Sequence, residues 1–491
     1  STGEVPWEAY TDAVKDSVAQ YGDVAIVTLA RVGGEGADLT HRDLNYLELD
    51  ENEKDLLKNL GAMKAEGTIK KIVVLINSSN TLQVDFLQNE EYGIDACMWI
   101  GDVGEVGINA VADILAGDIT PSGRLVDTYC NDNYSAPAMM NFGTTVYGDA
   151  EKYGLDENSM YYIVYQEGIY VGYRYYETRY EDYVMGTGNA GNYAYYEDVA
   201  YPFGFGLSYT DFEYSDMTVN YNAAKDVFEV TVKVTNTGDT YSGKETVQIY
   251  SQSPYTEYDK ANNVEKASVT LCGFGKTEIL APGQSETLTI EVEKRDLASY
   301  DAYGAKTYIL DAGDYYLTVG TDAHNALNNV LAAKGYTTAN GMTADGNAEF
   351  TFLYNNEALD AETYSVSSAT GAEITNQLQS ADLSQYGYDI TYLSRNNWVG
   401  TWPSVMEIEA TDQMFADGLY MYQTYNGIEG STTEMPTMGA KNGLTLAMMI
   451  GKDYDDPAWE DLLDQATFEE MAVLVGQGYH NTAVMPSVGK P

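Results

Sequence analysis

The sequence predicts a mixed α/β protein in which a mostly parallel sheet flanked by helices is followed by an all-β module. Within the first part, apolar runs such as "VAIVTLA" and "IVVLI" alternate with segments of helical periodicity, a pattern typical of parallel strands joined by helices. From about 212 to 330 the pattern becomes short strands of alternating polarity, separated by turns such as "NTGD" and "APGQ". The length of 491 residues also indicates more than one domain.

The first part can be assigned element by element. Apolar spacing predicts helices over 7–20, 53–67 and 104–116, the last closed by Gly117, and buried strands over 24–30, 70–78 and 94–102, with a short helix over 81–89. Sheets of this kind are covered by helices on both faces and bind ligands at the carboxyl ends of their strands. Three loops, 31–40, 77–81 and 101–107, should therefore share one edge.

Several smaller expectations concern single segments. Cys97 lies in an apolar run and is expected to be a buried thiol. The serines of "NSSN" are expected to cap a helix. The Tyr-rich stretch 147–183 is interpreted as loops whose rings are used in packing rather than for stacking on sugars.

The later parts follow the same reasoning. The strands from 212 to 330 suggest a β-sandwich of immunoglobulin-like or fibronectin type III-like form. From 331 the periodicity is weak and predicts an extended, irregular connector, and a new helix should begin near Pro457.

Charge and motif content exclude several classes of function. Lys and Arg total 26 against 75 Asp and Glu, a net charge of -49, which disfavours nucleic acid and anionic membranes as partners. No apolar run reaches the length of a membrane span. The three cysteines and three histidines are too scattered for a disulfide framework or a metal site. The loop "GGEGAD" lacks both the spacing and the lysine of phosphate-binding loops. No cofactor is therefore predicted.

One residue remains as a candidate for chemistry. Glu35 lies between glycines in the loop after the first strand, at the edge where ligands are expected. Flanking glycines allow the backbone to turn such a carboxylate outward, as a general acid requires. Composition alone leaves two alternatives open, a solvated loop glutamate and a catalytic one.

The order of motifs resembles glycoside hydrolase family 3, the β-glucosidase and β-xylosidase family. The segments that carry the resemblance are "GDVAIVTLARVGGEGADLT", "KKIVVLINSSNTLQVDF", "GDITPSGRLVDT", "QEGIYVGYRYYE" and "YPFGFGLSYT". In that family a loop glutamate of the α/β domain acts as general acid/base for a (β/α)8 barrel, which supplies an aspartate nucleophile. The resemblance implies that Glu35 is the acid/base and that Asp38 orients the loop or binds sugar. Gly33 stands where the family has a serine.

The resemblance also implies an arrangement of domains. Residues 1–210 would form the α/β domain with the acid/base loop, 211–330 the fibronectin type III-like sandwich and 331–455 the connector. Residues 456–491 resemble the opening of the barrel, and "YLSRNNWVGTWP", 392–403, resembles the linker of permuted members. The rest of the barrel is expected to follow Pro491 or to belong to a second chain.

The function implied is that of a part of an exo-acting retaining β-glycosidase, most simply a β-glucosidase acting on a β-glucoside or oligosaccharide. The one Ser-Asp pair of the chain, Ser215-Asp216, leads into the sandwich and is expected to be structural. The nucleophile should therefore lie outside this chain, and the chain alone should be inactive. The alternative is a non-catalytic carbohydrate-binding or cell-surface module. Acidity and resemblance are compatible with a secreted or a cytoplasmic bacterial protein and slightly favour the extracellular location.

Overall fold

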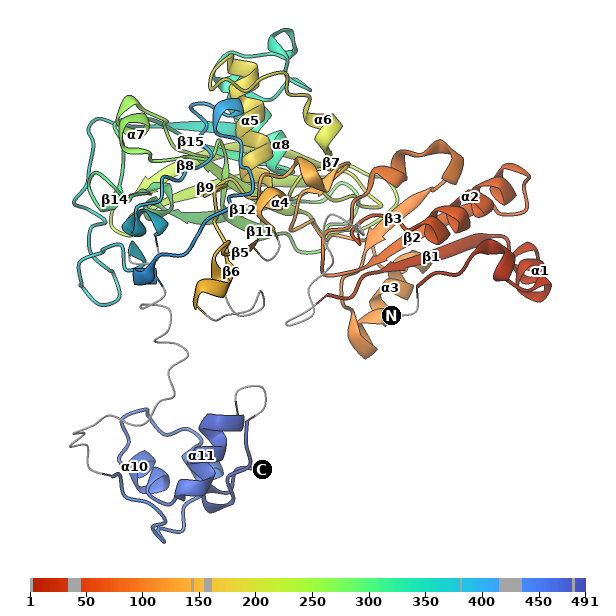
Figure 1. The fold of residues 1–491 in the computed structure, drawn as a ribbon. Helices are drawn as coiled ribbons and strands as arrows, with labels where there is room; N and C mark the ends of the chain where they lie inside the picture. The colour runs from red at the N-terminus through yellow and green to blue at the C-terminus, as the bar shows by residue number, and fades with distance from the viewer. Residues whose placement is uncertain are drawn as a thin grey trace. The chain divides into compact units, whose positions relative to one another are not determined.

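The computed structural model (Figure 1) describes residues 3–33, 46–142, 145–153, 161–379, 382–414, 435–478 and 482–491. The chain divides into two compact units, Ser1–Ala416 and Asp417–Pro491, each with its own apolar core. Among the described helices, none has the length and apolarity needed to cross a bilayer.

The first part of unit 1 contains the predicted parallel sheet. Its strands lie in the order β1-β2-β3, and parallel pairing places Ala30 beside Asn77 and Ile76 beside Trp99. Leu57 and Leu60 of the long helix α2 pack with the buried residues of β1 and β2 in one core. The elements of this region are η1 (Trp7–Ala9), α1 (Asp12–Gln20), β1 (Val24–Ala30), α2 (Glu51–Ala65), β2 (Lys71–Asn77), η2 (Asp85–Gln88), η3 (Glu90–Tyr92), β3 (Ala96–Trp99) and α3 (Gly104–Ala116).

The expectation of a sheet covered on both faces is wrong for β1 in the described part of the chain. Val27 and Leu29 are buried on the side of α2, whereas the alternating residues Val24 and Ile26 are 46% and 52% exposed. The expected burial of Cys97 is also wrong, because the residue as a whole is exposed to solvent. It lies in β3, which is an edge strand of this sheet among the described strands. Burial around its sulfur nonetheless raises the pKa of the Cys97 thiol to about 12.

Two antiparallel sheets form the predicted β-sandwich. One has the order β11-β10-β15-β16 and the other β12-β9-β8, and buried residues such as Phe228, Val230, Ile249 and Leu317 form the core between them. The strands are β8 (Phe212–Asn222), β9 (Val227–Asn236), β10 (Thr246–Gln252), β11 (Thr270–Lys276), β12 (Ser285–Glu293), β15 (Gly313–Gly320) and β16 (Thr351–Asn356). Asp216 lies within β8 at a register shift, in the sandwich as expected.

The region expected to be an irregular connector contributes to this sandwich. Strand β16 pairs antiparallel with β15 and completes its sheet. The helix α8 (Ala323–Ala333) also extends past the expected boundary at 330. Both were missed because a short strand and a helix of mixed Ala, Asn and Leu carry little periodicity.

The Tyr-rich stretch contains a buried helix where loops were predicted. Helix α5 (Tyr173–Met185) buries Tyr175, Tyr176 and Tyr180 almost completely. These rings join α8 and Trp398 in a separate core, so the predicted role in packing is confirmed although the loop assignment is wrong. The smaller elements of unit 1 are β4 (Tyr129–Cys130), α4 (Ala138–Asn141), β5 (Thr145–Val146), β6 (Tyr161–Tyr162), α6 (Tyr195–Asp198), β7 (Val199–Tyr201), α7 (Glu257–Asn262), β13 (Ser299–Asp301) and β14 (Thr307–Ile309).

Unit 2 contains two short helices around a small core. α10 (Ala458–Leu463) begins directly after Pro457, as expected, and α11 (Phe468–Gln477) follows. Thr467 and Glu470 form a capping box that starts the second helix. The predicted single helix is therefore interrupted at this cap.

Candidate active site

The carboxyl ends of β1, β2 and β3 meet at one edge of the sheet, as predicted. The parallel register leads residues 31, 78 and 100 out of the sheet on the same side. The backbone N–H of Arg31 donates to the carbonyl of Asn77 over 3.3 Å, and the side chain of Asn77 in turn donates to the carbonyl of Gly101. Three loops of distant sequence are thus joined by hydrogen bonds at this edge.

The serines of the second loop have a different role from the one expected. The hydroxyl of Ser78 accepts from the N–H of Asn80 at 3.1 Å and donates to its carbonyl at 2.8 Å, which closes a tight turn. Ser79 donates to the carboxylate of Asp102 in the third loop. Neither serine caps a helix, so this prediction was wrong, and both serve to hold the loops of the edge in place.

Glu35 and Asp38 both lie outside the described residues, within segment 34–45. The structure describes the two ends of this segment, which are Gly33 after β1 and Tyr46 before α2. A dense group of polar contacts lies between those ends, centred on Arg31 and Glu53.

The guanidinium of Arg31 is the centre of that group. It forms a bidentate ion pair with Glu53, at 2.8 Å from Nη1 and 2.7 Å from Nη2. It also donates to the carbonyls of Ala30, Tyr46 and Glu48, at 2.8, 2.5 and 2.6 Å respectively. No sequence pattern indicates this arrangement, because two of its three carbonyl acceptors belong to the irregular segment before α2.

A second carboxylate of interest follows the loop. Burial raises the pKa of the Glu48 carboxyl, Lys54 opposes this effect, and the negative charges of Asp85 and Asp132 add to it. A raised carboxyl pKa is a property of general acids. Because its backbone carbonyl also accepts from Arg31 beside the end of segment 34–45, Glu48, which sequence analysis did not identify, is included in the test of the acid/base assignment.

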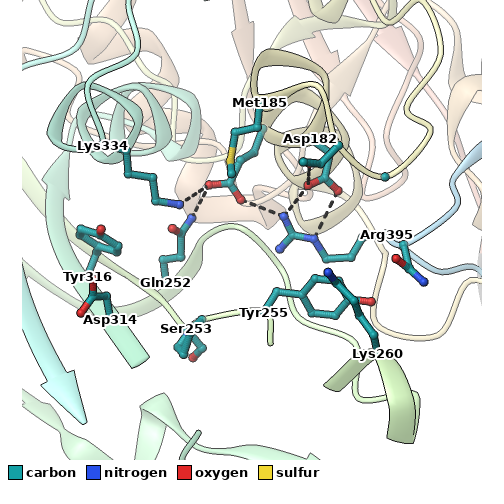
Figure 2. A pocket seen from close by; sticks show the side chains of 15 residues that line it. Asp182, Met185, Gln252, Ser253, Tyr255, Lys260, Asp314, Tyr316, Lys334 and Arg395 are labelled. Atoms are coloured by element: carbon teal, nitrogen blue, oxygen red, sulfur yellow. Dashed lines mark hydrogen bonds and ion pairs between the residues drawn. The ribbon is translucent and has the colours of Figure 1, made fainter. Parts of the chain in front are cut away.

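A polar pocket of about 390 Å³ lies elsewhere in unit 1, between α5, the strand ends near Gln252 and Asp314, and the segment of Arg395. Figure 2 shows Arg395 pointing toward Asp182, with Gln252 and Lys334 turned to a shared carboxylate, that of Glu181. Arg395 donates to Asp182 at 2.6 Å and to Glu181 at 3.0 Å. These buried charges neutralise one another, so this wall of the pocket is a structural network.

Comparison with known proteins agrees with this fold. Residues 8–173 match the glycosyl hydrolase family 3 C-terminal domain, and residues 245–323 match a fibronectin type III-like domain. The chain is 34% identical over 332 residues to a β-glucosidase of Ruminococcus albus, which covers 66% of this chain and 30% of that protein. It is 29% identical over 357 residues to β-glucosidase A of Butyrivibrio fibrisolvens, covering 66% of this chain and 39% of that protein.

Solved structures give the same result. β-Glucosidase 3B of Thermotoga neapolitana in complex with glucose matches with a TM-score of 0.54 and 27% identity, over 73% of this chain and 41% of that chain. A β-glucosidase of Paenibacillus barengoltzii matches with a TM-score of 0.57 and 25% identity, over 96% of this chain and 43% of that chain.

The matched regions correspond to the α/β domain, which is of a kind found in glycoside hydrolases, and to the fibronectin type III-like sandwich. Residues 8–173 thus match the C-terminal domain of glycoside hydrolase family 3, and the chain is similar to β-glucosidases of that family. It spans only 30% and 39% of the length of the two curated relatives above.

Proposed function

We propose that this chain is part of an exo-acting retaining β-glucosidase, and that Glu35 supplies its general acid/base. The observation that carries the proposal is the convergence of three loops at the carboxyl edge of the sheet, in the first of which Gly33 directly precedes segment 34–45. Ligand sites of parallel α/β sheets lie at this edge. The named activity of the relatives and the glucose in the Thermotoga structure support glucose as the sugar.

The proposal includes a division of the chain into domains. Residues 1–210 carry the acid/base loop, 211–330 the sandwich and 331–455 the connector, although β16 belongs to the sandwich sheet. Residues 456–491 form the first segment of a (β/α)8 barrel. The match to the Paenibacillus β-glucosidase supports this, because it extends over 96% of this chain. The barrel supplies the nucleophile, from this chain's continuation or from a second chain.

The chemistry requires two carboxyl groups about 5 to 5.5 Å apart. The nucleophile of the barrel attacks the anomeric carbon, while the Glu35 carboxylic acid donates its proton to the departing glycosidic oxygen. A covalent glycosyl-enzyme remains, and the Glu35 carboxylate then removes a proton from the water that hydrolyses it. Shielding from water by the barrel would raise the pKa of Glu35 toward neutrality, as the first step needs.

The test is the variant Glu35→Gln in an enzyme that contains both this chain and the barrel. Turnover of an alkyl β-glucoside should fall by about 10²- to 10⁴-fold, the usual contribution of a positioned general acid. Glu66→Gln is the matched control, because Glu66 is an exposed glutamate at the C-terminal end of α2, away from this sheet edge. Unchanged turnover in Glu35→Gln would reject the assignment, and a large loss in Glu48→Gln instead would transfer it to Glu48.

A further inference from the structure

We propose that the pocket between α5, the sandwich and the segment of Arg395 binds a neutral sugar of one or two rings, as a second sugar site apart from the acid/base. This inference goes beyond the proposed function and takes from it only the choice of a glucose disaccharide as the probe. The pocket has a volume of about 390 Å³. Sites for small molecules have volumes of roughly 300 to 1,000 Å³ and form preferentially where domains meet.

The pocket brings together parts of unit 1 that are distant in sequence. Strands β10 and β15 of the sandwich supply Gln252 and Tyr316, which are partners across the antiparallel ladder. Lys334 follows the last residue of α8. Figure 2 shows these three side chains on one side of the pocket and Tyr255 and Lys260 on the other. A ligand between the two sides would contact both the sandwich and the helices packed on it.

The charges of the lining are balanced. Three acidic and three basic residues line the pocket, namely Glu181, Asp182, Asp314, Lys260, Lys334 and Arg395. This balance is notable in a chain with a net charge of -49. A site for an anion needs an excess of cations, and a site for a hard metal ion needs carboxylates that are available to coordinate it. Here the buried carboxylates are already paired with arginine and lysine. The lining therefore favours a neutral ligand.

The side chain of Gln252 gives the strongest indication of a missing partner. Gln252 is only 4% exposed, and its amide nitrogen donates to Glu181 at 2.9 Å and to the carbonyl of Ser268 at 2.5 Å. These two acceptors fix the orientation of the amide. No residue in the described part of the chain donates to its carbonyl oxygen, and a buried acceptor without a donor costs free energy. A hydroxyl group in the pocket would supply that donor.

Donors and an acceptor for the rest of a sugar are also present. Nζ of Lys334 donates to Glu181 at 2.8 Å, and Nζ of Lys260 donates to Glu257 at 2.6 Å. An ammonium group has three N–H donors, so the described contacts leave two on each lysine for a ligand. Asp314 adds an exposed carboxylate at the start of β15. A hydroxyl both donates and accepts, so sugar hydroxyls can pair with the lysines and with the carboxylate at the same time.

The test is isothermal titration calorimetry of the 491-residue chain with cellobiose at pH 7. Asp314→Ala and Lys260→Met should each weaken the binding by about 10- to 100-fold, the loss expected when a hydrogen bond to a charged group is removed. The side chain of Lys260 is 34% exposed, and Asp314 is an exposed residue. Both variants should therefore keep the thermal unfolding midpoint of the wild type.

Asp239→Ala is the matched control for these variants. Asp239 is an exposed aspartate in the loop after β9 of the same sandwich and does not line the pocket. Its affinity for cellobiose should equal that of the wild type. Inorganic phosphate is the second probe, because an anion would be attracted by the lysines and repelled by Asp314. Phosphate binding that weakens in Lys260→Met and tightens in Asp314→Ala would assign the pocket to anions and overturn the proposal.

Comparison with Glu35→Gln separates this proposal from the proposed function. Loss of cellobiose binding in Glu35→Gln, with full binding in Asp314→Ala and Lys260→Met, would place the sugar at the acid/base and overturn the pocket site while the function stands. Unchanged turnover of Glu35→Gln in the enzyme that contains the barrel would reject the function and leave the pocket site in place. Absence of cellobiose binding to the wild-type chain would overturn the pocket site in either case.

Discussion

Replacement of Arg395 by methionine should lower the free energy of unfolding of unit 1 by about 3 to 5 kcal/mol, as expected when one partner of a buried ion pair is removed. Arg395 donates to Asp182 at 2.6 and 3.2 Å and to Glu181 at 3.0 Å, and all three residues are buried. Asp182 also accepts from the indole of the fully buried Trp398 at 2.8 Å. The variant would leave this acidic pair without its main cation.

The dependence on pH gives this prediction a second readout. Burial alone would raise the pKa of the Glu181 carboxyl, but Lys334 and Arg395 together hold it below its ordinary value. A depressed carboxyl pKa contributes stability above the unfolded pKa, near 4.5, and that contribution is lost as the pH falls below it. The difference between wild type and Arg395→Met should therefore narrow on acidification.

Urea unfolding curves from pH 7 down to about pH 3, below the ordinary carboxyl pKa, would measure both effects. Arg174→Met is the control, because Arg174 is an exposed arginine on the same helix, α5, and surface changes usually stay within about 0.5 kcal/mol. A loss in Arg395→Met no larger than that of the control would show that the network contributes little.

Lys266→Met is expected to be comparably destabilising, by about 3 to 5 kcal/mol. The ammonium of Lys266 lies 3.0 Å from Oδ1 of Asp259 and also contacts Asp311, and the side chains of all three residues are at most 2% exposed. This cluster has two carboxyl groups for one lysine. Burial accordingly raises the pKa of Asp311, the charge of Lys266 opposes that shift, and the charge of Asp259 adds to it.

The second acid supplies an internal control for this prediction. Asp311→Asn removes the excess negative charge and keeps the Lys266–Asp259 pair, so it should cost less than Lys266→Met. Because the pKa of Asp311 is raised in the fold, protonation favours the folded state as the pH falls toward the ordinary value of 3.8. Equal losses in the two variants, measured by urea unfolding at pH 7, would contradict this description of the charges.

Local pattern predicted the elements whose apolar residues repeat strongly. The strand over Val24–Ala30 and the helix α3 with Gly117 in the left-handed conformation at its end both follow from short runs of sequence. The sandwich strands were equally clear, because inward and outward residues alternate in β9 and β12.

Tertiary contacts account for what the sequence could not show. Helix α5 has no side-chain cap and is rich in tyrosine, a residue of modest helix propensity, and it is held by the core that it shares with α8 and Trp398. Arg395 lies far along the chain from Asp182, and no local motif connects them. The same holds for Arg31, whose carbonyl acceptors belong to an irregular segment.

In the candidate site, too, some features could be predicted from the sequence and others only from the structure. The meeting of three loops at one sheet edge followed from the parallel topology. The role of Glu35 came from resemblance, because a glycine-flanked glutamate is chemically ambiguous by itself. The bidentate ion pair of Arg31 with Glu53 could be recognised only from the structure.

The most direct test of the central claim is azide rescue of Glu35→Ala in the enzyme that contains the barrel, with dinitrophenyl β-glucoside as substrate. Without its base, the variant should accumulate the glycosyl-enzyme. Azide needs no deprotonation, so it should attack the anomeric carbon as the bond to the nucleophile carboxylate breaks. The account predicts faster dinitrophenol release and β-glucosyl azide as the product. Unchanged release and the absence of that azide would contradict the assignment of Glu35 as the acid/base.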